Sequence, residues 1–379
     1  MAEALPEPRP LLSITIPTYN RAAYLCELLD VLLPQLRGES RVELLVSDNA
    51  STDGTPELLE GFARRGLLFR LLRNVKNQGS DANFLRCLSE ARGKYVWVLG
   101  DDDLVLPAAV ADLLSLLSQG ERPVTTRGGA SGRDAGGDFD LVYLSSVGFS
   151  GPFRMPPAAA LADRLGRFAE VVTDDAYFVE KVNALLGLIS VVLVNKDRLL
   201  AMPHPPMEEL NGTNLLQLGW IFPLLRPGPG RRTRVLYVWQ RLVAYRSFNS
   251  TGWGVCEVFG VRLGAIAARY FGGLIAGSAR PELVRAVMNG VLRYWLSDKI
   301  YLIRTGAEHT GLNDEDIARL LRPLYRRNWR YWVFVWPMAR WPLPMARAVR
   351  PVLTLANRLT RGAQALWRHL FRHGTYLKP

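Results

Sequence analysis

The chain of 379 residues has few cysteines and no long hydrophobic run. Cys26, Cys87 and Cys256 are odd in number and follow no metal-binding spacing, which favours a reducing compartment and argues against a zinc site or a disulfide framework. No stretch of about eighteen uncharged apolar residues occurs, so we expect no membrane-spanning helix. Residues 1–8 lack the basic and apolar regions of a secretory signal, and the expected location is the cytoplasm.

Two common nucleotide-binding signatures are also missing. Neither Gly-x-Gly-x-x-Gly after the first expected strand nor Gly-x-x-x-x-Gly-Lys-Ser/Thr occurs. An ordinary dinucleotide-binding fold and a P-loop are therefore unsupported. A diphosphate bound by this chain would be held mainly through a metal ion rather than by a glycine cradle.

Strand-like and helix-like segments alternate over residues 11–118. The β-branched or apolar stretches that predict strands are 11–16, 42–47, 69–73 and 95–99, and the helices are expected at 23–36, from 55 onward, at 84–92 and at 107–117. This alternation is typical of βαβ units on a parallel sheet. A polar cluster follows every strand, at 17–21, 48–55, 76–83 and 101–103. Because ligands bind outside the carboxyl ends of such strands, we expect the site there.

Three adjacent carboxylates, Asp101–Asp103, follow the apolar strand that ends near Leu99. Like charges held side by side disfavour one another's ionisation unless a cation intervenes. Mg²⁺ takes a few carboxylate oxygens and leaves the rest of its shell to water and substrate phosphates. The triplet therefore indicates an enzyme that handles a nucleoside diphosphate. The alternative is a solvated turn before the helix that starts near Pro107.

Four motifs, in this order, resemble the family 2 glycosyltransferases of the GT-A fold. They are Ile16–Arg21, Val46–Thr55, Asn77–Gly79 with Asn83, and Leu99–Asp103 with Pro107. The resemblance covers roughly residues 11–118, weakens afterwards, and extends to sugar transferases of bacterial O-antigen assembly, abequosyltransferase-like sequences included. It implies an α/β fold with a Rossmann-like, mostly parallel sheet flanked by helices. It also implies inverting transfer of a sugar from a nucleoside diphosphate, of the UDP or dTDP type, to a hydroxyl of a lipid-linked or other glycan acceptor.

The resemblance assigns roles to residues of each motif. Pro17, Thr18, Tyr19 and Asn20 would line the base and ribose, Asp48 would hydrogen-bond the base, and Asn77 and Gly79 would shape the ribose and diphosphate side. Asp101, Asp102 and Asp103 would hold Mg²⁺ or Mn²⁺, with Asp101 also on the nucleotide side. The leading Asp of the family's acidic run is Gly100 here, so metal binding is expected from the acids that follow. Asp53 and Thr55 are expected to be structural.

A general base must deprotonate the acceptor hydroxyl. The family places it near a Glu-Asp pair well downstream of the metal motif, where this chain reads Met207–Asn214 without such a pair. Glu209 and Glu208 are the candidates, and Asp174 or Asp175 come next. The alternative is that these are ordinary surface acids.

The pattern after residue 118 is less regular. It predicts a Gly-rich loop at 125–138, a strand at 139–147, a helix at 158–183, a strand at 188–194, two short extended stretches in 234–245, and helices at 255–271, 281–303 and 313–326. We expect a catalytic domain at 1–250 with its nucleotide-binding half at 11–118. A helical subdomain at 251–325 and a tail at 326–379 would follow.

The tail carries most of the excess positive charge. After Asp316 there are thirteen Lys and Arg and no Asp or Glu, and five of the ten tryptophans lie there. A basic, Trp-rich, amphipathic segment is typical of a helix lying on anionic lipid, with 331–338 at the headgroup boundary. This predicts a peripheral protein on the inner face of the plasma membrane. A packed helical bundle is the alternative, and the apolar stripe argues against nucleic acid.

Two other functions compete with a transferase of bacterial surface polysaccharide assembly. A sugar-nucleotide nucleotidyltransferase would usually carry a Gly-rich basic loop after the first strand, which 17–21 lacks. A catalytically degenerate, sugar-nucleotide-binding scaffold at the membrane is suggested by Gly100 and by the missing Glu-Asp pair.

Overall fold

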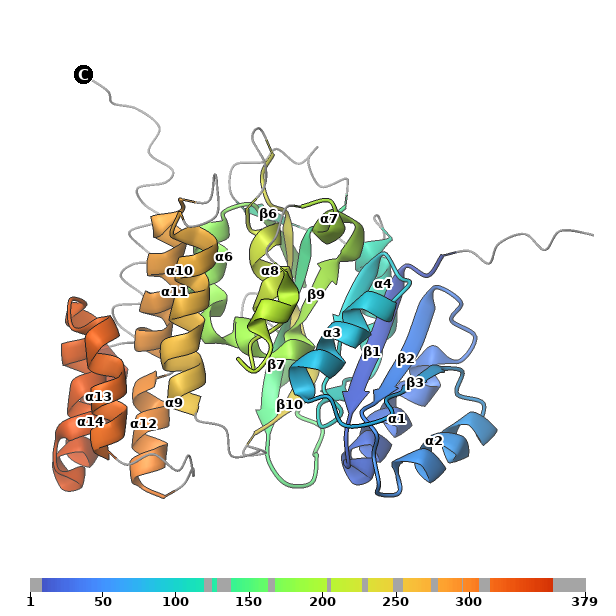
Figure 1. The fold of residues 1–379 in the computed structure, drawn as a ribbon, viewed down its shortest axis with the longest axis horizontal. Coiled ribbons are helices and arrows are strands. Elements are labelled where there is room, and N and C mark those ends of the chain that lie inside the picture. The colour runs from blue at the N-terminus through green and yellow to red at the C-terminus, as the bar shows by residue number, and fades with distance from the viewer. Residues whose placement is uncertain are drawn as a thin grey trace, which may run out of the picture.

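A mixed sheet runs through the centre of the molecule (Figure 1). The computed structural model describes residues 9–118, 125–127, 138–162, 168–202, 206–226, 231–247, 255–273, 279–294, 296–306 and 314–356. The strands over the first hundred residues are β1 (Leu12–Thr18), β2 (Val42–Asp48), β3 (Arg70–Arg73) and β4 (Tyr95–Val98). They are parallel and lie in the order β3-β2-β1-β4, which confirms the βαβ prediction.

The sheet continues beyond β4 with strands from the second half of the chain, in the order β9-β7-β10-β8-β6. Their bounds are β9 (Val192–Asn195), β7 (Leu141–Phe149), β10 (Val235–Arg246), β8 (Ala169–Val172) and β6 (Thr125–Arg127), and β5 (Leu104–Val105) pairs with β10. β9 is antiparallel to both β4 and β7, whereas β7 and β10 are parallel. The sheet is thus mostly parallel in its first half and mixed in its second.

Helices cover both faces because the strand side chains alternate between two apolar surfaces. Ile14, Ile16 and Trp97 belong to a buried cluster with α1 (Ala22–Leu36), α2 (Thr55–Arg64) and α4 (Ala109–Leu117). Val96 and Val98 face the other way, into a cluster with α3 (Ser80–Glu90), α6 (Asp175–Val182) and α8 (Leu218–Leu224). The result is the three-layer arrangement in which the carboxyl ends of β1, β2 and β4 share one edge.

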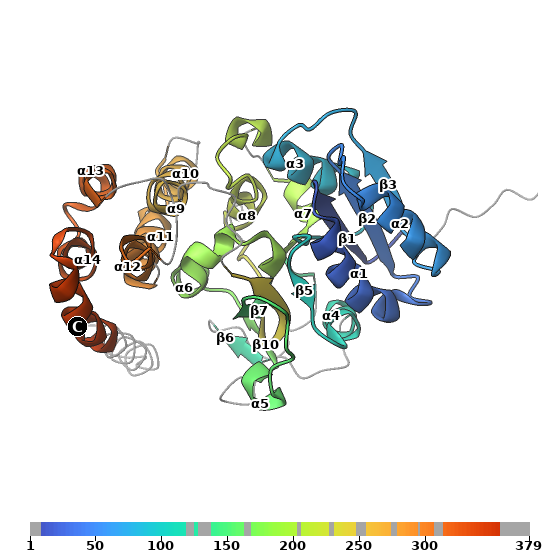
Figure 2. The same ribbon diagram turned by 90° about the horizontal axis from the view of Figure 1, so that it is seen from below.

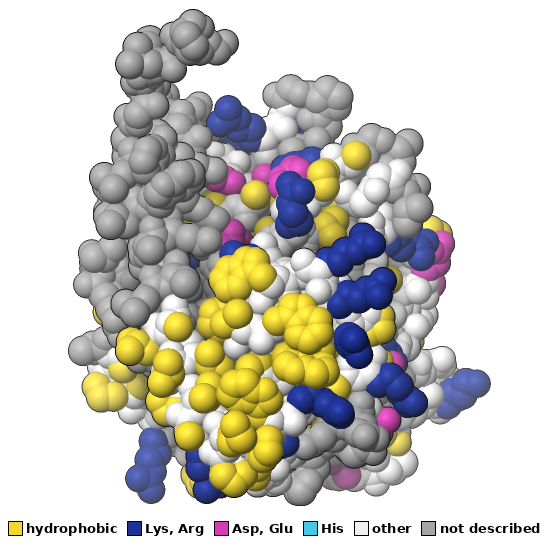
Figure 3. Space-filling view, turned by 90° about the vertical axis from the view of Figure 1, so that its left-hand side faces the viewer, with side chains coloured by type: hydrophobic (Ala, Val, Ile, Leu, Met, Phe, Trp, Pro, Cys, Tyr) yellow, Lys and Arg dark blue, Asp and Glu magenta, His cyan; other side chains and the backbone are white. Residues whose placement is uncertain are grey.

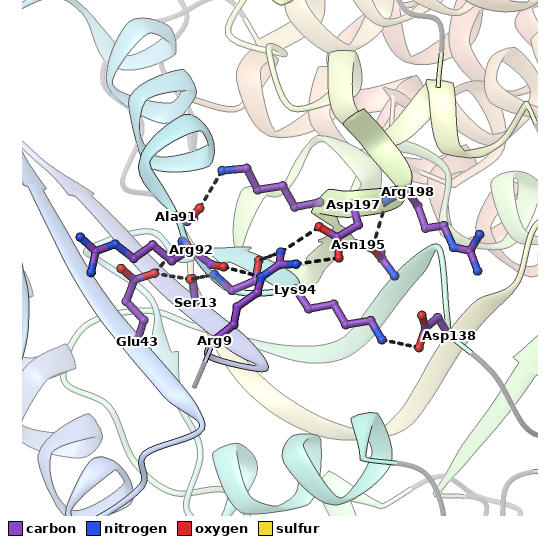
Figure 4. Close-up of polar contacts among 12 residues, drawn as sticks. Arg9, Ser13, Glu43, Ala91, Arg92, Lys94, Asp138, Asn195, Asp197 and Arg198 are labelled. Atoms are coloured by element: carbon purple, nitrogen blue, oxygen red, sulfur yellow. Dashed lines mark hydrogen bonds and ion pairs between the residues drawn. The ribbon is translucent and has the colours of Figure 1, made fainter. Parts of the chain in front are cut away.

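Polar contacts fix the opposite edge of the sheet (Figure 4). Ser13 Oγ donates to Glu43 and accepts from the Gly93 amide at 2.7 Å, and the Arg92 amide donates to Glu43 at 2.8 Å. Arg9 donates to both carboxylate oxygens of Asp197, which follows β9. These contacts tie β1, β2, the turn before β4 and the end of β9 together on the side away from the polar motifs.

Four expected elements differ from the structure. The helix expected at 158–183 is wrong in part: a short helix α5 (Ala158–Leu161) is followed by strand β8, and only then does α6 begin. The expected strand at 188–194 begins as a 3₁₀ turn, Ile189–Val191, before β9. The two extended stretches at 234–245 are one strand, β10, with register shifts that explain their broken pattern. The loop expected at 125–138 is wrong at its start, because Thr125–Arg127 form strand β6 beside β8, and residues 128–137 lie outside the described residues.

Helices after residue 255 form the end of the molecule farthest from β3 (Figures 1 and 2). They are α9 (Val255–Glu257), a π-helical turn (Val258–Arg262), α10 (Leu263–Phe271), α11 (Pro281–Tyr294), α12 (Leu296–Arg304), α13 (Asp314–Tyr325), a second π-helical turn (Tyr331–Val335), α14 (Trp336–Arg340) and a helix over 343–356. α11 packs on α6, and one buried apolar cluster runs from the sheet to Ala346.

This packing corrects part of the expectation for the tail. Tyr331, Val335 and Met338 are buried in that cluster, so one face of the stretch that we expected at the headgroup boundary packs on the core, whereas Trp332 and Val333 on its other face are exposed. Residues 357–379, with Trp367, lie outside the described residues. In the part of the chain that the structure describes, no helix combines the length and the apolar character needed to cross a bilayer.

Candidate active site

A hydrogen bond between β1 and β4 marks the centre of the candidate site. Thr18 ends β1, and its Oγ1 donates to Oδ2 of Asp101, just beyond β4, at 2.8 Å. The chain order reverses at this point, since β2 and β3 lie on one side of β1 and β4 on the other. Ligands of open α/β sheets bind in the crevice at such a reversal. Both side chains are buried there.

Arg21 brings a positive charge to the same place. Its Nη1 lies 3.1 Å from Oδ1 of Asp101 and 2.9 Å from Oδ2 of Asp102. The loop before α1 supplies the guanidinium, and the turn after β4 supplies the carboxylates. Two carboxylates therefore converge on one cation, as the repulsion between adjacent acids requires.

Asp103 is held by different partners. Its Oδ1 accepts from the backbone amide of Arg246, at the end of β10, at 2.9 Å, and it is also bonded to Ser190. Arg246 donates through Nε to the carbonyl of Asp102 at 3.1 Å. Among the described residues, no group of three or more His, Cys, Asp or Glu side chains is arranged to hold a metal ion.

Burial dominates the electrostatics of these acids. It raises the pKa of Asp101 to about 6, while the charge of Arg21 opposes the rise. Burial and the neighbouring charge of Asp102 also raise the pKa of Asp103. Burial thus disfavours the ionised carboxylates of Asp101 and Asp103. A cation bound next to them would favour the ionised forms and so lower these pKa values.

Gly100 has a steric reason to be glycine. A Cβ at this position would lie 3.0 Å from Oδ1 of Asp102 and 3.3 Å from Oγ of Ser190. The Gly100 amide itself donates to Ser190 Oγ at 2.8 Å. The turn is packed too closely for an Asp side chain at position 100, where the family motif has its leading Asp. Asp101 and Asp102, which follow, supply the carboxylates that face Arg21.

Asp48 lies buried at the end of β2, next to β1. Its Oδ1 accepts from the amide of Ser51 at 2.9 Å, and its Oδ2 lies 3.4 Å from Nε of Arg73. The carboxylate is therefore fixed by its own loop and by the end of β3. The structure places it on the same edge as Thr18 and Asp101.

Asn49 joins the loops around Asp48. Its side-chain nitrogen donates to Asn77 at 2.7 Å and to the Gly79 carbonyl at 3.2 Å, and its oxygen accepts from the amide of Gln78 at 2.9 Å. Gly79 has a φ of 87°, in the left-handed region that glycine tolerates. Asn77 and Gly79 thus shape the loop before α3.

The loop at 17–21 is braced against the loop after β2. The Asn20 amide donates to Ser51 Oγ at 3.0 Å, and Asn20 Oδ1 accepts from the Thr52 amide at 2.8 Å. Tyr19, in the same loop, is 40% exposed and so free to contact a ligand. Asp53 accepts from the amides of Ala22 and Thr55 at the starts of α1 and α2, which confirms its structural role.

The segment that carries the candidate bases contacts both ends of α3, whose first turn lies at the carboxyl edge of the sheet. Lys196 donates to the carbonyl of Ala91, near the far end of α3, whereas the Asn214 amide donates to Asp81 in the first turn at 3.1 Å. Glu209 lies between these residues in sequence, in the 3₁₀ turn Met207–Leu210, which contacts α3, and it forms an ion pair with Arg269 of α10. Glu208 is exposed.

Asp174 and Asp175 lie at the other edge of the sheet. They follow Val172, which pairs with the first residue of β10. Asp174 caps α6 by accepting from Tyr177, and Asp175 pairs with Arg280 at 3.0 Å. Their position removes the support for these second-choice bases.

Sequence reasoning missed several residues that build this site. Arg21 and Asn49 lie inside the motifs recognised in the sequence. Their position next to residues predicted to bind the ligand could have identified them as site residues. Ser190 and Arg246 come from the second half of the chain, where the motifs end. Only the pairing of β9 with β4 and of β10 with β5 brings them near Asp103.

Acids and amides gathered at the carboxyl edge of a mostly parallel sheet, at a reversal of strand order, are the arrangement of an α/β protein that binds a nucleotide there. The comparisons agree: a family model described as glycosyl transferase family 2 matches residues 13–139. Residues 13–139, about a third of the chain, therefore form a family 2 glycosyltransferase domain of the GT-A type.

Individual relatives cover mainly this domain. The abequosyltransferase RfbV of Salmonella typhimurium is 42% identical over 109 residues, 28% of this chain and 32% of that protein. The GalNAc(5)-diNAcBac-PP-undecaprenol beta-1,3-glucosyltransferase of Campylobacter jejuni is 30% identical over 115 residues, 29% of this chain and 36% of that protein. The matched region thus spans about a third of the length of these curated relatives.

A solved structure resembles nearly the whole chain in fold. The crystal structure of S. aureus TarS 1–349 has a TM-score of 0.52, 16% sequence identity, and coverage of 97% of this chain and 93% of that chain. The structure of the same fragment in complex with UDP-GlcNAc also has a TM-score of 0.52. This likeness supports the fold, C-terminal helices included.

Proposed function

We propose that this protein transfers a sugar from a nucleoside diphosphate to an acceptor hydroxyl during assembly of a bacterial surface polysaccharide. The observation that carries the proposal is the convergence of Thr18, Arg21 and Asp101 at the β1–β4 reversal, within a family 2 glycosyltransferase domain. The donor's base and ribose would lie along 17–20 and against Asp48. We propose a uracil or thymine base, because their ring N–H suits a carboxylate acceptor.

The acids after β4 fit a divalent cation. One oxygen of Asp101 and one of Asp102 lie within hydrogen-bond distance of the same cationic group, the guanidinium of Arg21. A divalent ion such as Mg²⁺ commonly binds one or two carboxylates beside substrate phosphates. We propose that these two, with Asp103 beside them, hold the metal. When bound, the ion would neutralise the departing diphosphate.

The rest of the mechanism concerns bond making at the sugar. In the proposed inverting reaction, the acceptor oxygen forms a bond to the anomeric carbon as the bond to the diphosphate oxygen breaks on the opposite face. A base takes the proton of the acceptor hydroxyl. We propose Glu209 or Glu208 for this step, since their segment approaches the site edge through Asn214 and Asp81. Glu209 would first have to exchange its partner Arg269 for the acceptor.

We further propose that the acceptor is a lipid-linked glycan and that the protein works at the inner face of the plasma membrane. Support comes from the basic tail after Asp316 and from a relative whose name includes an undecaprenol-linked glycan. In domain terms, residues 1–250 would be catalytic, 251–325 would form a helical subdomain, and the basic tail at 326–379 would face the membrane.

The decisive experiment has two steps. A panel of nucleotide sugars is screened for thermal stabilisation with and without Mn²⁺, and the best donor is then tested for transfer with wild type and Asp102→Asn. We expect transfer by wild type and none by the variant, with the fold intact in both. Glu60→Gln, an exposed acid on α2, is the matched control and should retain full activity.

Other outcomes would select the competing functions. Release of pyrophosphate from a nucleoside triphosphate would indicate a nucleotidyltransferase. Donor binding without turnover, even with lipid acceptor and metal present, would indicate a degenerate scaffold. Wild-type turnover by Asp102→Asn would overturn the metal assignment.

A further inference from the structure

An arginine-lined pocket lies between α13 and α14, in the C-terminal helices. Its volume is about 650 Å³. The lining side chains that matter here are Asp316, Arg319, Arg322, Arg326, Trp336 and Arg340. None of them belongs to the sugar-nucleotide site, which lies at the edge of the sheet.

The amphipathic pattern of α13 explains why the arginines gather. Ile317, Leu321 and Tyr325 follow one another at four-residue spacing and are buried in the core. The basic residues at 319, 322 and 326 are spaced by three and four residues, so they form a stripe along the exposed side. Arg340 approaches the same space from α14.

The pocket carries positive charge without matching carboxylates. Its one acid, Asp316, pairs with Arg319 at 3.2 Å. Within the described part of the chain, no ion pair involves the side chain of Arg322, Arg326 or Arg340. Three guanidinium groups that share one hollow repel one another, and an anion between them would relieve that repulsion. Guanidinium donors match the oxygens of a phosphate in particular.

A buried hydroxyl adds a second, independent observation. Tyr331 is fully buried, and its hydroxyl has no hydrogen-bond partner among the described residues. The ring of Tyr331 lies 6.1 Å from that of Trp336, which lines the pocket. Burial raises the pKa of Tyr331, and the charges of Arg322 and Arg340 oppose that rise. The Tyr331 hydroxyl, a donor without an acceptor among the described residues, is therefore near the arginine-lined pocket.

The pocket adjoins an apolar surface. The rings of Trp332 and Trp336 lie 5.1 Å apart, so the pocket wall continues into Trp332, which is 40% exposed. Figure 3 shows hydrophobic side chains gathered over this face, with a row of Lys and Arg along one side. The exposed large apolar side chains of this region are Leu324, Trp329, Trp332, Val333, Met345, Val352 and Leu355.

We propose that the pocket binds the phosphate of an anionic phospholipid headgroup while Trp329, Trp332 and Val333 insert among the lipids. This deepens the membrane part of the proposed function and rests on it. The combination of exposed aromatics with adjacent arginines matches the boundary of a bilayer, where apolar chains meet negative headgroups. A soluble ligand would account for the arginines but not for the neighbouring apolar surface.

The test measures binding of the full chain to vesicles, without sugar donor or acceptor. We expect wild type to sediment with phosphatidylcholine vesicles that contain phosphatidylglycerol, and not with phosphatidylcholine alone. Arg322→Gln/Arg340→Gln should bind about thirtyfold more weakly, because each basic residue near an anionic surface contributes about a fivefold factor in affinity. Trp332→Ala should also bind more weakly.

The matched control removes the same charge elsewhere. Arg37→Gln/Arg64→Gln alters the α1–α2 end of the molecule and should bind like wild type (Figure 1). Equal losses in both double variants, or equal binding to neutral and anionic vesicles, would overturn the proposal. Glycerol phosphate that binds as tightly as vesicles would assign the pocket to a soluble phosphate ester instead and overturn it too.

Melting curves separate misfolding from lost contacts, since Arg322 and Arg340 are exposed and neither is part of the core. A Trp332→Phe variant that restores binding would support insertion of an aromatic ring. Because no transfer is measured, failure here leaves the glycosyltransferase proposal standing. Failure of the transfer assay likewise leaves this result intact.

Discussion

Nη1 of Arg21 lies 2.9 Å from Oδ2 of Asp102, and the same nitrogen reaches Asp101. The guanidinium therefore supplies part of the positive charge that the acids after β4 require. It does so from the loop before α1, which is one of the proposed donor-binding segments. Loss of Arg21 should consequently affect both the stability of the site and its demand for a metal ion.

We expect Arg21→Gln to lower the free energy of unfolding by about 1–3 kcal/mol at neutral pH, because a partly buried, charged hydrogen-bonding group is removed. Mn²⁺ should then raise the melting temperature of the variant more than that of wild type, since a ligand of the folded state stabilises it by mass action and the carboxylates have lost their competitor. Thermal melts with and without Mn²⁺ measure this.

Arg64→Gln serves as the control for Arg21, because it removes an exposed guanidinium on α2 whose ion-pair partner among the described residues is Glu60, at 3.6 Å. Its melting temperature should stay near that of wild type with or without the metal. Identical Mn²⁺ responses in wild type and Arg21→Gln would show that the metal does not use Asp101 and Asp102.

Gly100→Ala tests the close packing of the turn after β4. The added Cβ would lie 3.0 Å from Oδ1 of Asp102, so this carboxylate must shift by a few tenths of an ångström. We expect a loss of kcat/KM of the order of tenfold, because small misplacements of a positioning group are costly. The stability cost should be about 1 kcal/mol.

Gly61→Ala is the matched control for Gly100→Ala. It lies within α2, and its Cβ would meet only Arg64, at 4.0 Å. This variant should keep full activity and gain about 0.5–1 kcal/mol of stability, since alanine is a better helix former than glycine. A Gly100→Ala enzyme with wild-type kcat/KM would contradict the role of Asp102.

The first half of the fold follows from the sequence because each local signal there agrees with its neighbours. Ile14 and Ile16 alternate with Ser13 and Thr15 in a strand that is buried on both faces, and Pro56 opens α2 as expected. The polar clusters follow the strands directly, so topology alone brings them to one edge. The order of strands and polar clusters along the chain was therefore enough to place the candidate acids.

The second half could not be placed in this way. β8 is four residues long and lies between two helices, and its strand character depends on pairing with β10, about sixty residues away in sequence. The contact of Arg246 with Asp103 likewise spans 143 positions. The Trp-rich stretch after Trp329 has one buried and one exposed face, and composition could not tell which side chains face the core.

The opposite edge of the sheet gives a prediction about stability alone. A Cβ at Gly93 would lie 2.5 Å from the Ser13 nitrogen and 2.8 Å from the Leu12 carbonyl carbon, both in backbone that cannot yield easily. Gly93→Ala should lower the free energy of unfolding by about 2–3 kcal/mol. The folded fraction should keep its kcat, because the site lies at the other edge.

Gly54→Ala is the control for Gly93→Ala, since nothing lies within 4 Å of its Cβ and its φ of −69° suits alanine. Its stability should change by less than about 0.5 kcal/mol. Chemical denaturation of both variants gives the comparison. If the two variants are equally stable, the close packing of the Gly93 turn against the backbone of β1 is contradicted.

Arg9 and Asp197 give the last prediction, which concerns pH. Hydrogen bonds from Arg9 lower the pKa of Asp197, so the folded state favours the ionised carboxylate. A folded pKa below the unfolded value, about 3.9, adds stability that is present above pH 4 and is lost as pH falls through the folded pKa. Asp197→Asn should therefore unfold at lower urea than wild type at pH 7.

The difference between wild type and Asp197→Asn should shrink below about pH 4, where the wild-type carboxylate also becomes neutral. It should also shrink in high salt at pH 7, because both side chains are half exposed and their attraction is screened. Urea midpoints at pH 7 and pH 3 measure the effect, with Glu60→Gln as a control that changes little. If the difference in urea midpoint between wild type and Asp197→Asn is the same at pH 7 and pH 3, Asp197 stabilises the fold through its shape rather than its charge.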